Sequence, residues 1–171
     1  SEREQQVNMV SYLNVGSAWG VAAGNPKNFD PSNPCGATIA VQTGTAQEEY
    51  AATLSDECIA AGKEKITVMP HELQTDIATK LTGGQYDATL ADSTVIGYTS
   101  SQSAGKIEQL GDTFESAPQG VAVAKDDAQL AEAVQKAMQY LMDNGYLNDI
   151  LASYGAENAA LTTATLNPTV D

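Results

Sequence analysis

Short apolar runs alternate with longer amphipathic stretches along most of the chain. Continuous apolar runs bounded by turn residues are typical of strands buried in a parallel sheet, and apolar residues three or four positions apart indicate helices. We expect strands at 17–23, 37–42, 65–69, 86–92, 106–111 and 119–125, and helices at 46–61, 73–84, 93–103, 126–145 and 146–155. This alternation predicts an α/β protein with a mainly parallel sheet flanked by helices.

Polar residues and glycines predict where the helices begin and end. Thr75 is the expected N-cap of the helix within 73–84, and Gly83-Gly84 is its expected end. Asp126 and Gln129 have the spacing of a capping box at the start of the longest helix. The tail from residue 156 has no clear periodicity, and we expect it to be loose or to pack as an irregular strap.

The charge of the chain excludes some classes of partner. Its 171 residues carry a net charge of −14, so few cations are available for the phosphates of nucleic acid or for an anionic membrane surface. A solvated, acidic surface explains this charge without any partner. No run of about 20 apolar residues is present, so we expect no membrane span, and no signal peptide is visible.

The two cysteines, Cys35 and Cys58, fit no zinc-binding or C-x-x-C spacing. Cys35 precedes an expected strand, and Cys58 lies near the end of the helix that follows it, so the two ends lie near each other in a β-α unit. A disulfide there would contribute about 3 kcal/mol in the chain-entropy model and would imply an oxidising compartment. Two free, buried thiols are the alternative.

The stretch "IAVQTGTAQEEY" joins an expected strand to an expected helix, and it is the first candidate binding site. Gly44 allows a sharp turn, and the free N–H groups of Ala46 and Gln47 in the first helical turn suit an anion. The Thr45 hydroxyl can donate as well. The alternative is a purely structural turn in which Thr45 caps the helix and the two following glutamates complement its dipole. No Gly-Lys-Ser/Thr follows, so the pattern is not a P-loop.

Asp92, at the end of the run "ATLAD", is the second candidate. Ligands in parallel α/β sheets bind beyond the carboxyl ends of strands, where a carboxylate can hold an ammonium group. Together the two strand ends predict a clamp for a zwitterion, with helix N–H groups for its carboxylate and Asp92 for its ammonium. The alternative is that Asp92 only caps the helix that begins at Ser93.

Other groups give little sign of catalysis or metal binding. His71 is the only histidine, and we expect a surface loop residue rather than a base. No serine or cysteine has the surroundings of a catalytic nucleophile, and Trp19 is expected to pack in a core or hinge. We therefore predict no enzyme activity, no cofactor and no metal.

Three blocks of the sequence resemble the family 3, polar-amino-acid, substrate-binding proteins of ABC importers. They are "AVQTGTAQEEY", "LQTDIATKLTGGQYDATLADS" and "APQGVAVAKDDAQLAEAVQKAMQYLMDNGYLNDILASYG", and the match runs in order from about Glu2 to Gly155. The family has the type II periplasmic-binding-protein fold, in which two α/β lobes hold the amino acid between them. The resemblance implies an incomplete two-lobe architecture, a truncated piece whose signal peptide and lipid anchor belong to the missing part.

The resemblance also implies boundaries for the lobes. Residues 1–23 would be a remnant of lobe one with the first hinge strand, and 24–115 would form the second lobe. Residues 116–155 would be the return hinge strand and the C-terminal helices of lobe one, followed by a tail at 156–171. Truncation would expose apolar surface between the lobes and promote dimers or strand exchange.

The site residues that the resemblance implies extend the clamp. Arg3 would grip the ligand carboxylate, and Gln74 and Thr75 would lie where the ligand side chain is contacted. The family's Gly-Thr-Thr/Ser turn falls on Gly44-Thr45-Ala46, where Ala46 lacks the hydroxyl. The full set of expected ligand-binding residues is Arg3, Gly44, Thr45, Ala46, Gln47, Gln74 and Asp92. Gln119 stands where the family often has an aromatic residue, and some Gram-positive members carry the cysteine pair, which favours the disulfide.

The expected function is capture of an amino acid outside the cell or in the periplasm, by a secreted protein or cell-surface lipoprotein that delivers it to an ABC permease. Two other functions stay open. One is an enzyme on the same scaffold, similar to cyclohexadienyl dehydratase, and the other is the extracellular amino-acid sensor domain of a signalling receptor.

Overall fold

The computed structural model describes residues 5–169, which form two compact units. The central unit is Ser17–Phe114, and the terminal unit combines Ser1–Gly16 with Glu115–Asp171. Two long strands, β1 (Val7–Ala22) and β5 (Ile107–Ala124), run through both units. Each unit is described separately below.

The central unit is built on a mixed sheet. Its further strands are β2 (Thr38–Gln42), β3 (Thr67–His71) and β4 (Ala88–Asp92), and the order across the sheet is β3-β2-β4-β1-β5. Strand β2 pairs in parallel with both β3 and β4, whereas β1 pairs antiparallel with β4. The predicted α/β class with helices flanking the sheet is confirmed, with an antiparallel β1 beside the parallel strands.

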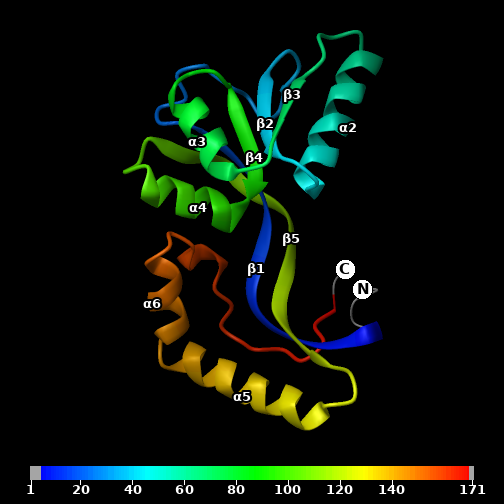
Figure 1. Ribbon diagram of the computed structural model, residues 1–171, viewed down its shortest axis with the longest axis vertical. Helices are drawn as coiled ribbons and strands as arrows, with labels where there is room; N and C mark the ends of the chain where they lie inside the picture. Colours follow the sequence, from blue (N-terminus) through cyan, green and yellow to red (C-terminus); the bar gives the residue numbers. More distant parts are fainter. Residues whose placement is uncertain (1–4, 170–171) are drawn as a thin grey trace. The chain divides into compact units, whose positions relative to one another are not determined.

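Helices cover both faces of this sheet, as Figure 1 shows. Helix α2 (Ala46–Ala60) lies on one face, and α3 (Gln74–Thr82) and α4 (Ser93–Gln102) lie on the other. The alternation along β2 explains the two layers, because Ile39 and Val41 join the larger core, whereas Ala40 joins the core under α3. A strand that is buried on both faces reads as a continuous apolar run, which is why the sequence predicts it well.

Gly20 on β1 allows α4 to approach the sheet closely. A Cβ atom at this position would lie 2.9 Å from both the Ile96 Cδ1 and the Thr89 Cγ2 atoms. Ile96 and Thr89 are almost completely buried, so neither has room to move away. Glycine is therefore required here by packing rather than by backbone conformation.

The structure confirms most predicted elements and corrects three details. The expected strands 106–111 and 119–125 are parts of one strand, β5. Helix α3 begins at Gln74 after the N-cap Leu73, so Thr75 is not its cap. At the start of α5 (Ala128–Asp143) the N-cap is Asp127, which accepts a hydrogen bond from the Leu130 N–H at 2.9 Å, so the predicted capping box at Asp126 is wrong.

Cys35 and Cys58 form a disulfide in the central unit. Cys58 is buried in the core under α2, on the helix face that also carries Tyr50 and Leu54. The bridge closes a loop with a sequence separation of 23 residues and ties the chain before β2 to the last turn of α2. The expectation of a bridge is confirmed, and free thiols are excluded.

The terminal unit has few elements. They are α5, α6 (Tyr146–Ala152) and the short 3-10 helix η1 (Glu157–Ala159), with the outer parts of β1 and β5. The tail packs as an irregular strap, as one of the two expectations stated. It makes isolated bridges to β1 at Val10↔Leu166 and Leu13↔Ala160, and Gln135 on α5 donates to the Ala164 carbonyl.

Candidate functional site

The turn between β2 and α2 forms the first part of the candidate site. Gly44 has φ +75, a left-handed conformation that glycine adopts without strain. Its N–H donates to the Glu48 Oε2 atom at 2.7 Å, and the Thr45 Oγ1 accepts from the Glu48 N–H at 3.3 Å. This reciprocal arrangement is a variant of the capping box, and it fixes the turn without a ligand.

The Thr45 hydroxyl is committed to the fold. It donates its proton to the Gln42 carbonyl at 2.7 Å while it caps the helix. The structural reading of Thr45 is therefore confirmed. A contact of this hydroxyl with a ligand stays a prediction, and it would require the bond to Gln42 to break.

The first turn of α2 presents two free donors. The N–H groups of Ala46 and Gln47 have no hydrogen-bond acceptor among residues 5–169, as expected for the start of a helix. Ala46 is exposed, so its N–H lies near solvent. Two free N–H groups at a helix N-terminus favour an anion such as a carboxylate.

Asp92 lies at the end of β4, and the Gln47 side chain links it to the start of α2. The Gln47 Nε2 donates to the Asp92 Oδ1 at 2.9 Å and to the Ser17 Oγ at 3.1 Å. Ser17 is paired with Asp92 in the antiparallel register of β1 and β4. Three neighbouring elements therefore place Ser17, Gln47 and Asp92 in one polar cluster.

The Asp92 carboxylate is half-buried and carries no cation. No ion pair among residues 5–169 involves it, and its Oδ2 atom accepts no hydrogen bond within this range. It occupies the N-cap position of α4, yet its side chain makes no capping hydrogen bond. The alternative is therefore confirmed for the position of Asp92 but not for a capping bond of its side chain, and a role of its Oδ2 atom in ligand binding stays a prediction.

The other predicted residues either make no hydrogen bond to this cluster or are not described. Gln74 and Thr75 begin α3 and line a groove between α3 and α4, with no hydrogen bond to Gln47 or Asp92. Arg3 lies outside the described residues. His71 is half-buried, and its Nε2 lies 2.6 Å from the Tyr86 hydroxyl, so it is not a loop residue but the last residue of β3. Roles for Gln74 and Arg3 in binding stay predictions.

Sequence reasoning missed two features of the cluster. Ser17 is only 7% exposed. The one sign in the sequence that it belongs to the cluster is its hydroxyl group at the start of an apolar strand. The side chain of Gln47 was also missed, because only its N–H was considered. Both depend on the pairing of β1 with β4, which the sequence does not specify.

A mixed α/β sheet flanked by helices, with polar groups at the carboxyl ends of its parallel strands, defines the type II periplasmic-binding-protein-like class. Among curated proteins the chain is 36% identical over 167 residues to the arginine-binding protein ArgT of Corynebacterium glutamicum, a match that covers 97% of the chain and 55% of ArgT. The chain therefore spans about half the length of this relative. No family model matches the chain.

Solved structures show the same fold. A polar amino acid ABC uptake transporter substrate-binding protein from Streptococcus thermophilus has a TM-score of 0.71 at 18% identity, covering 94% of the chain and 61% of that protein. The ancestral amino-acid-binding protein AncCDT-1, a precursor of cyclohexadienyl dehydratase, has a TM-score of 0.64 at 22% identity, covering 90% and 64%. The predicted resemblance to polar amino-acid substrate-binding proteins of ABC transporters is confirmed.

No helix within residues 5–169 is both long and apolar enough to cross a membrane. In the same range no group of three or more histidine, cysteine, aspartate or glutamate side chains is placed to hold a metal ion.

Proposed function

We propose that the chain is part of a receptor that captures a free amino acid and supplies it to an ABC permease. The N–H groups of Ala46 and Gln47 bind the ligand carboxylate, and the free oxygen of Asp92 binds its ammonium group. The observation that carries the proposal is the Asp92 carboxylate, which is half-buried, accepts one hydrogen bond from the neutral Gln47 amide and has no ion-pair partner among residues 5–169. A buried charge without a counterion is costly, and a ligand ammonium removes that cost.

The similar proteins support the class of ligand. The relative from Corynebacterium glutamicum is named for arginine binding, and both reported structures are of amino-acid-binding or polar amino acid substrate-binding proteins. Arginine or a related polar amino acid is accordingly the first ligand to test. In this proposal the central unit is the second lobe, and Arg3 grips the ligand carboxylate.

The place of action follows from the same class. The Cys35–Cys58 disulfide favours an oxidising compartment, so we place the protein outside the cell or in the periplasm, with a removed signal peptide and a lipid anchor carried by the rest of the protein. Accessibility of the intact protein to protease on whole cells, and its release by lipoprotein-directed detergent phase separation, tests this placement.

Calorimetric titration of the intact protein with a panel of amino acids tests the proposed ligand clamp. Asp92→Asn keeps the shape of the side chain and its bond to Gln47 but removes the charge. We expect this variant to bind the preferred amino acid at least about thirtyfold more weakly, because truncating a paired charge costs about 2 kcal/mol or more. Asp112→Asn, at an exposed position on β5, is the matched control and should bind normally.

Unchanged affinity of Asp92→Asn would remove Asp92 from the ligand site. Mass spectrometry of the reaction mixture separates a receptor from an enzyme, since a receptor returns the amino acid unaltered. A changed product would favour the enzyme related to cyclohexadienyl dehydratase, for which the similarity to AncCDT-1 provides the scaffold. The sequence of the complete gene distinguishes the sensor-domain alternative, which requires a signalling segment.

A further inference from the structure

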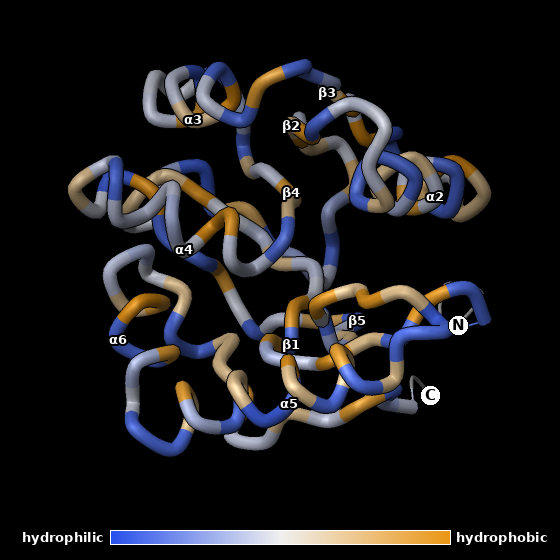
Figure 2. The backbone as a smooth tube through the Cα atoms, turned by 60° about the horizontal axis from the view of Figure 1, so that its bottom comes forward, coloured by the Kyte–Doolittle hydropathy of each residue, from blue (hydrophilic) through white to orange (hydrophobic). Residues whose placement is uncertain are grey.

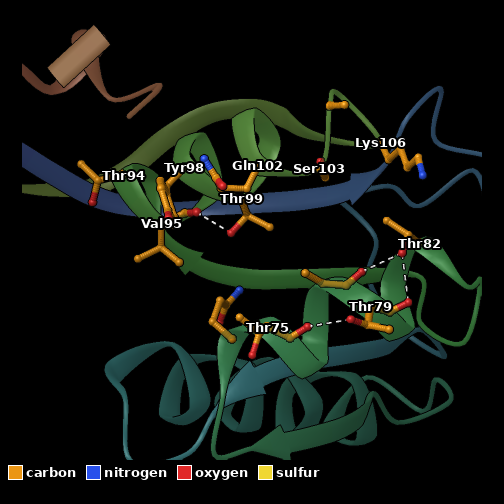
Figure 3. Close-up of a pocket in the computed structure, with 13 residues that line it drawn as sticks. Thr75, Thr79, Thr82, Thr94, Val95, Tyr98, Thr99, Gln102, Ser103 and Lys106 are labelled. Carbon is orange, nitrogen blue, oxygen red and sulfur yellow. Dashed lines mark hydrogen bonds between the residues drawn. The ribbon is translucent and has the colours of Figure 1, made fainter. Parts of the chain in front are cut away.

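A groove between α3 and α4 is a feature of the central unit that the amino-acid clamp does not use. It has a volume of about 770 Å³, within the range of roughly 300–1,000 Å³ that is typical of small-molecule sites. Figure 3 shows threonine side chains of α3 along one wall and residues of α4 and the following turn along the other. Gln47 and Asp92 do not line it, so it is separate from the clamp.

Gln74 is the unexplained group in this groove. Its amide nitrogen and oxygen are both shielded from solvent, and neither has a hydrogen-bond partner within the described residues. The great majority of buried polar atoms in proteins are hydrogen-bonded, and each unpaired one lowers the stability of the fold by about 1–3 kcal/mol. Gln74 therefore carries one donor and one acceptor for which the fold supplies no partner.

Three threonine hydroxyl groups along the groove donate their protons elsewhere and not to Gln74. Thr79 donates to the Thr75 carbonyl at 3.0 Å, Thr82 to the Ala78 carbonyl at 2.9 Å, and Thr99 to the Val95 carbonyl at 2.7 Å. Each of these hydroxyl protons is thus donated to a carbonyl group of its own helix. The hydroxyl oxygens remain acceptors, so the walls of the groove favour a ligand that brings N–H donors.

Lys106 adds a positive charge to the lining of the groove. It makes no ion pair with any residue between 5 and 169. In Figure 3 it lies beyond Ser103, on the side of Thr82 and away from Thr94. Because Gln74 and Thr82 are eight positions apart on one helix, the two ends of the groove are about 12 Å apart.

We propose that this groove is a second ligand site, which takes an elongated small molecule with a primary amide at one end and a carboxylate at the other. The primary amide forms a reciprocal pair of hydrogen bonds with the Gln74 amide, and the carboxylate lies against Lys106. Val95 and the half-exposed Tyr98 supply apolar contacts for the chain between the two groups. Because the Gln74 amide is shielded from solvent, its side chain must rotate to meet the ligand, and a half-buried side chain makes such rotamer changes rapidly.

The probe is adipamic acid, the monoamide of a linear dicarboxylic acid, studied by titration calorimetry and by NMR chemical shifts. Its amide and its carboxylate could also reach the clamp, at Asp92 and at the N–H groups of Ala46 and Gln47. NMR shifts at those three residues therefore report binding at the clamp, whereas shifts at α3 and α4 report binding in the groove. We expect saturable binding with shifts confined to α3, α4 and Lys106. The N,N-dimethyl amide lacks the N–H donors and should bind at least about tenfold more weakly, and the neutral diamide should lose the salt-dependent part of binding.

Two variants make the assignment decisive. Gln74→Met should weaken binding of adipamic acid at least about tenfold and, without ligand, should raise the melting temperature, because it removes two unpaired polar atoms. Gln85→Met, at an exposed loop position, is the matched control and should change neither quantity. Absence of saturable binding, full binding by Gln74→Met, or a lower melting temperature of that variant would each overturn the proposal.

Discussion

The central and terminal units bury their apolar residues to very different extents. In the central unit both faces of the sheet are covered, and the side chains of Ile39, Leu81 and Ile96 are completely inaccessible to solvent. In the terminal unit α5 is strongly amphipathic, and Figure 2 shows polar and apolar residues alternating along it, yet Ala131 is its only buried residue among those described. Leu130 is 49% exposed and Tyr140 is 60% exposed.

This difference shows that an amphipathic helix has an apolar face suited to burial, but that burial also requires another element to pack against that face. In the central unit a five-stranded sheet and the helices α2, α3 and α4 cover one another's apolar faces. In the terminal unit the cover is a small core around Leu13 and Val15, supplemented by polar contacts of the strap such as the Gln139 side chain with the Ala164 N–H at 2.9 Å. We therefore expect stability to be concentrated in the central unit.

The largest expected effect comes from a pair of equal truncations, one in each unit. Leu81→Ala should lower the free energy of unfolding by about 2–5 kcal/mol, because a completely buried leucine leaves a cavity. Leu130→Ala should cost less than about 1 kcal/mol, since half of that side chain is already in water. Urea unfolding followed by far-ultraviolet circular dichroism measures both, and equal losses would show that the two units are equally well packed.

The disulfide should stabilise only the unit that contains it. Replacement of both Cys35 and Cys58 by serine should lower the free energy of unfolding by about 3 kcal/mol, as expected for a closed loop of this length. Amide hydrogen exchange should accelerate in β2 and α2 and stay unchanged in α5. Reduced wild-type protein is the control, and acceleration in α5 equal to that in α2 would show that the units unfold together.

The smallest effect is electrostatic and belongs to the terminal unit. The hydrogen bond from the Lys136 Nζ to Glu132, and then its charge, lower the pKa of the Glu132 carboxyl group. Because the folded pKa lies below the unfolded one, this pair contributes stability above the unfolded pKa, and the contribution is lost as the pH falls through the folded pKa. The pair is fully exposed, so the contribution is small and is screened by salt.

Lys136→Met should raise the pKa of Glu132 towards the ordinary carboxyl range. The same substitution should remove the small pH-dependent stability of α5 and leave amide exchange in the central unit unchanged. An NMR titration of the Glu132 side chain measures this pKa. No movement of the pKa would show that the ion pair does not persist in solution.

The sequence predicts the central unit well because its signals are local. The strand 37–42 is a continuous apolar run, and α2 is bounded by Thr45 as N-cap, so pattern and structure agree. Long-range features are different, because the continuity of β5 depends on its place beside β1, and the cap of α5 depends on a choice between adjacent aspartates. The pattern of apolar and polar residues alone predicts neither the continuity of β5 nor the N-cap of α5.

The candidate site shows the same division. Gly44 and Asp92 were predicted because each stands directly after an apolar strand, a position where polar groups often bind ligands. Ser17 and the Gln47 side chain could not be predicted, since their meeting requires the register that places Ser17 opposite Asp92. The unpaired amide of Gln74 likewise becomes visible only when every neighbour of the groove is known.

The aromatic cluster around Trp19 provides a built-in optical reporter for one unit. Trp19 is the only tryptophan in the chain and is 5% exposed, with its ring centroid 5.1 Å from that of Phe29 and 6.4 Å from that of Phe114. All three rings belong to the central unit. The intrinsic fluorescence of Trp19 therefore records the melting of that unit without any label. Excitation at the red edge of the absorption band avoids the tyrosines of α5 and α6, so they do not contribute to the emission.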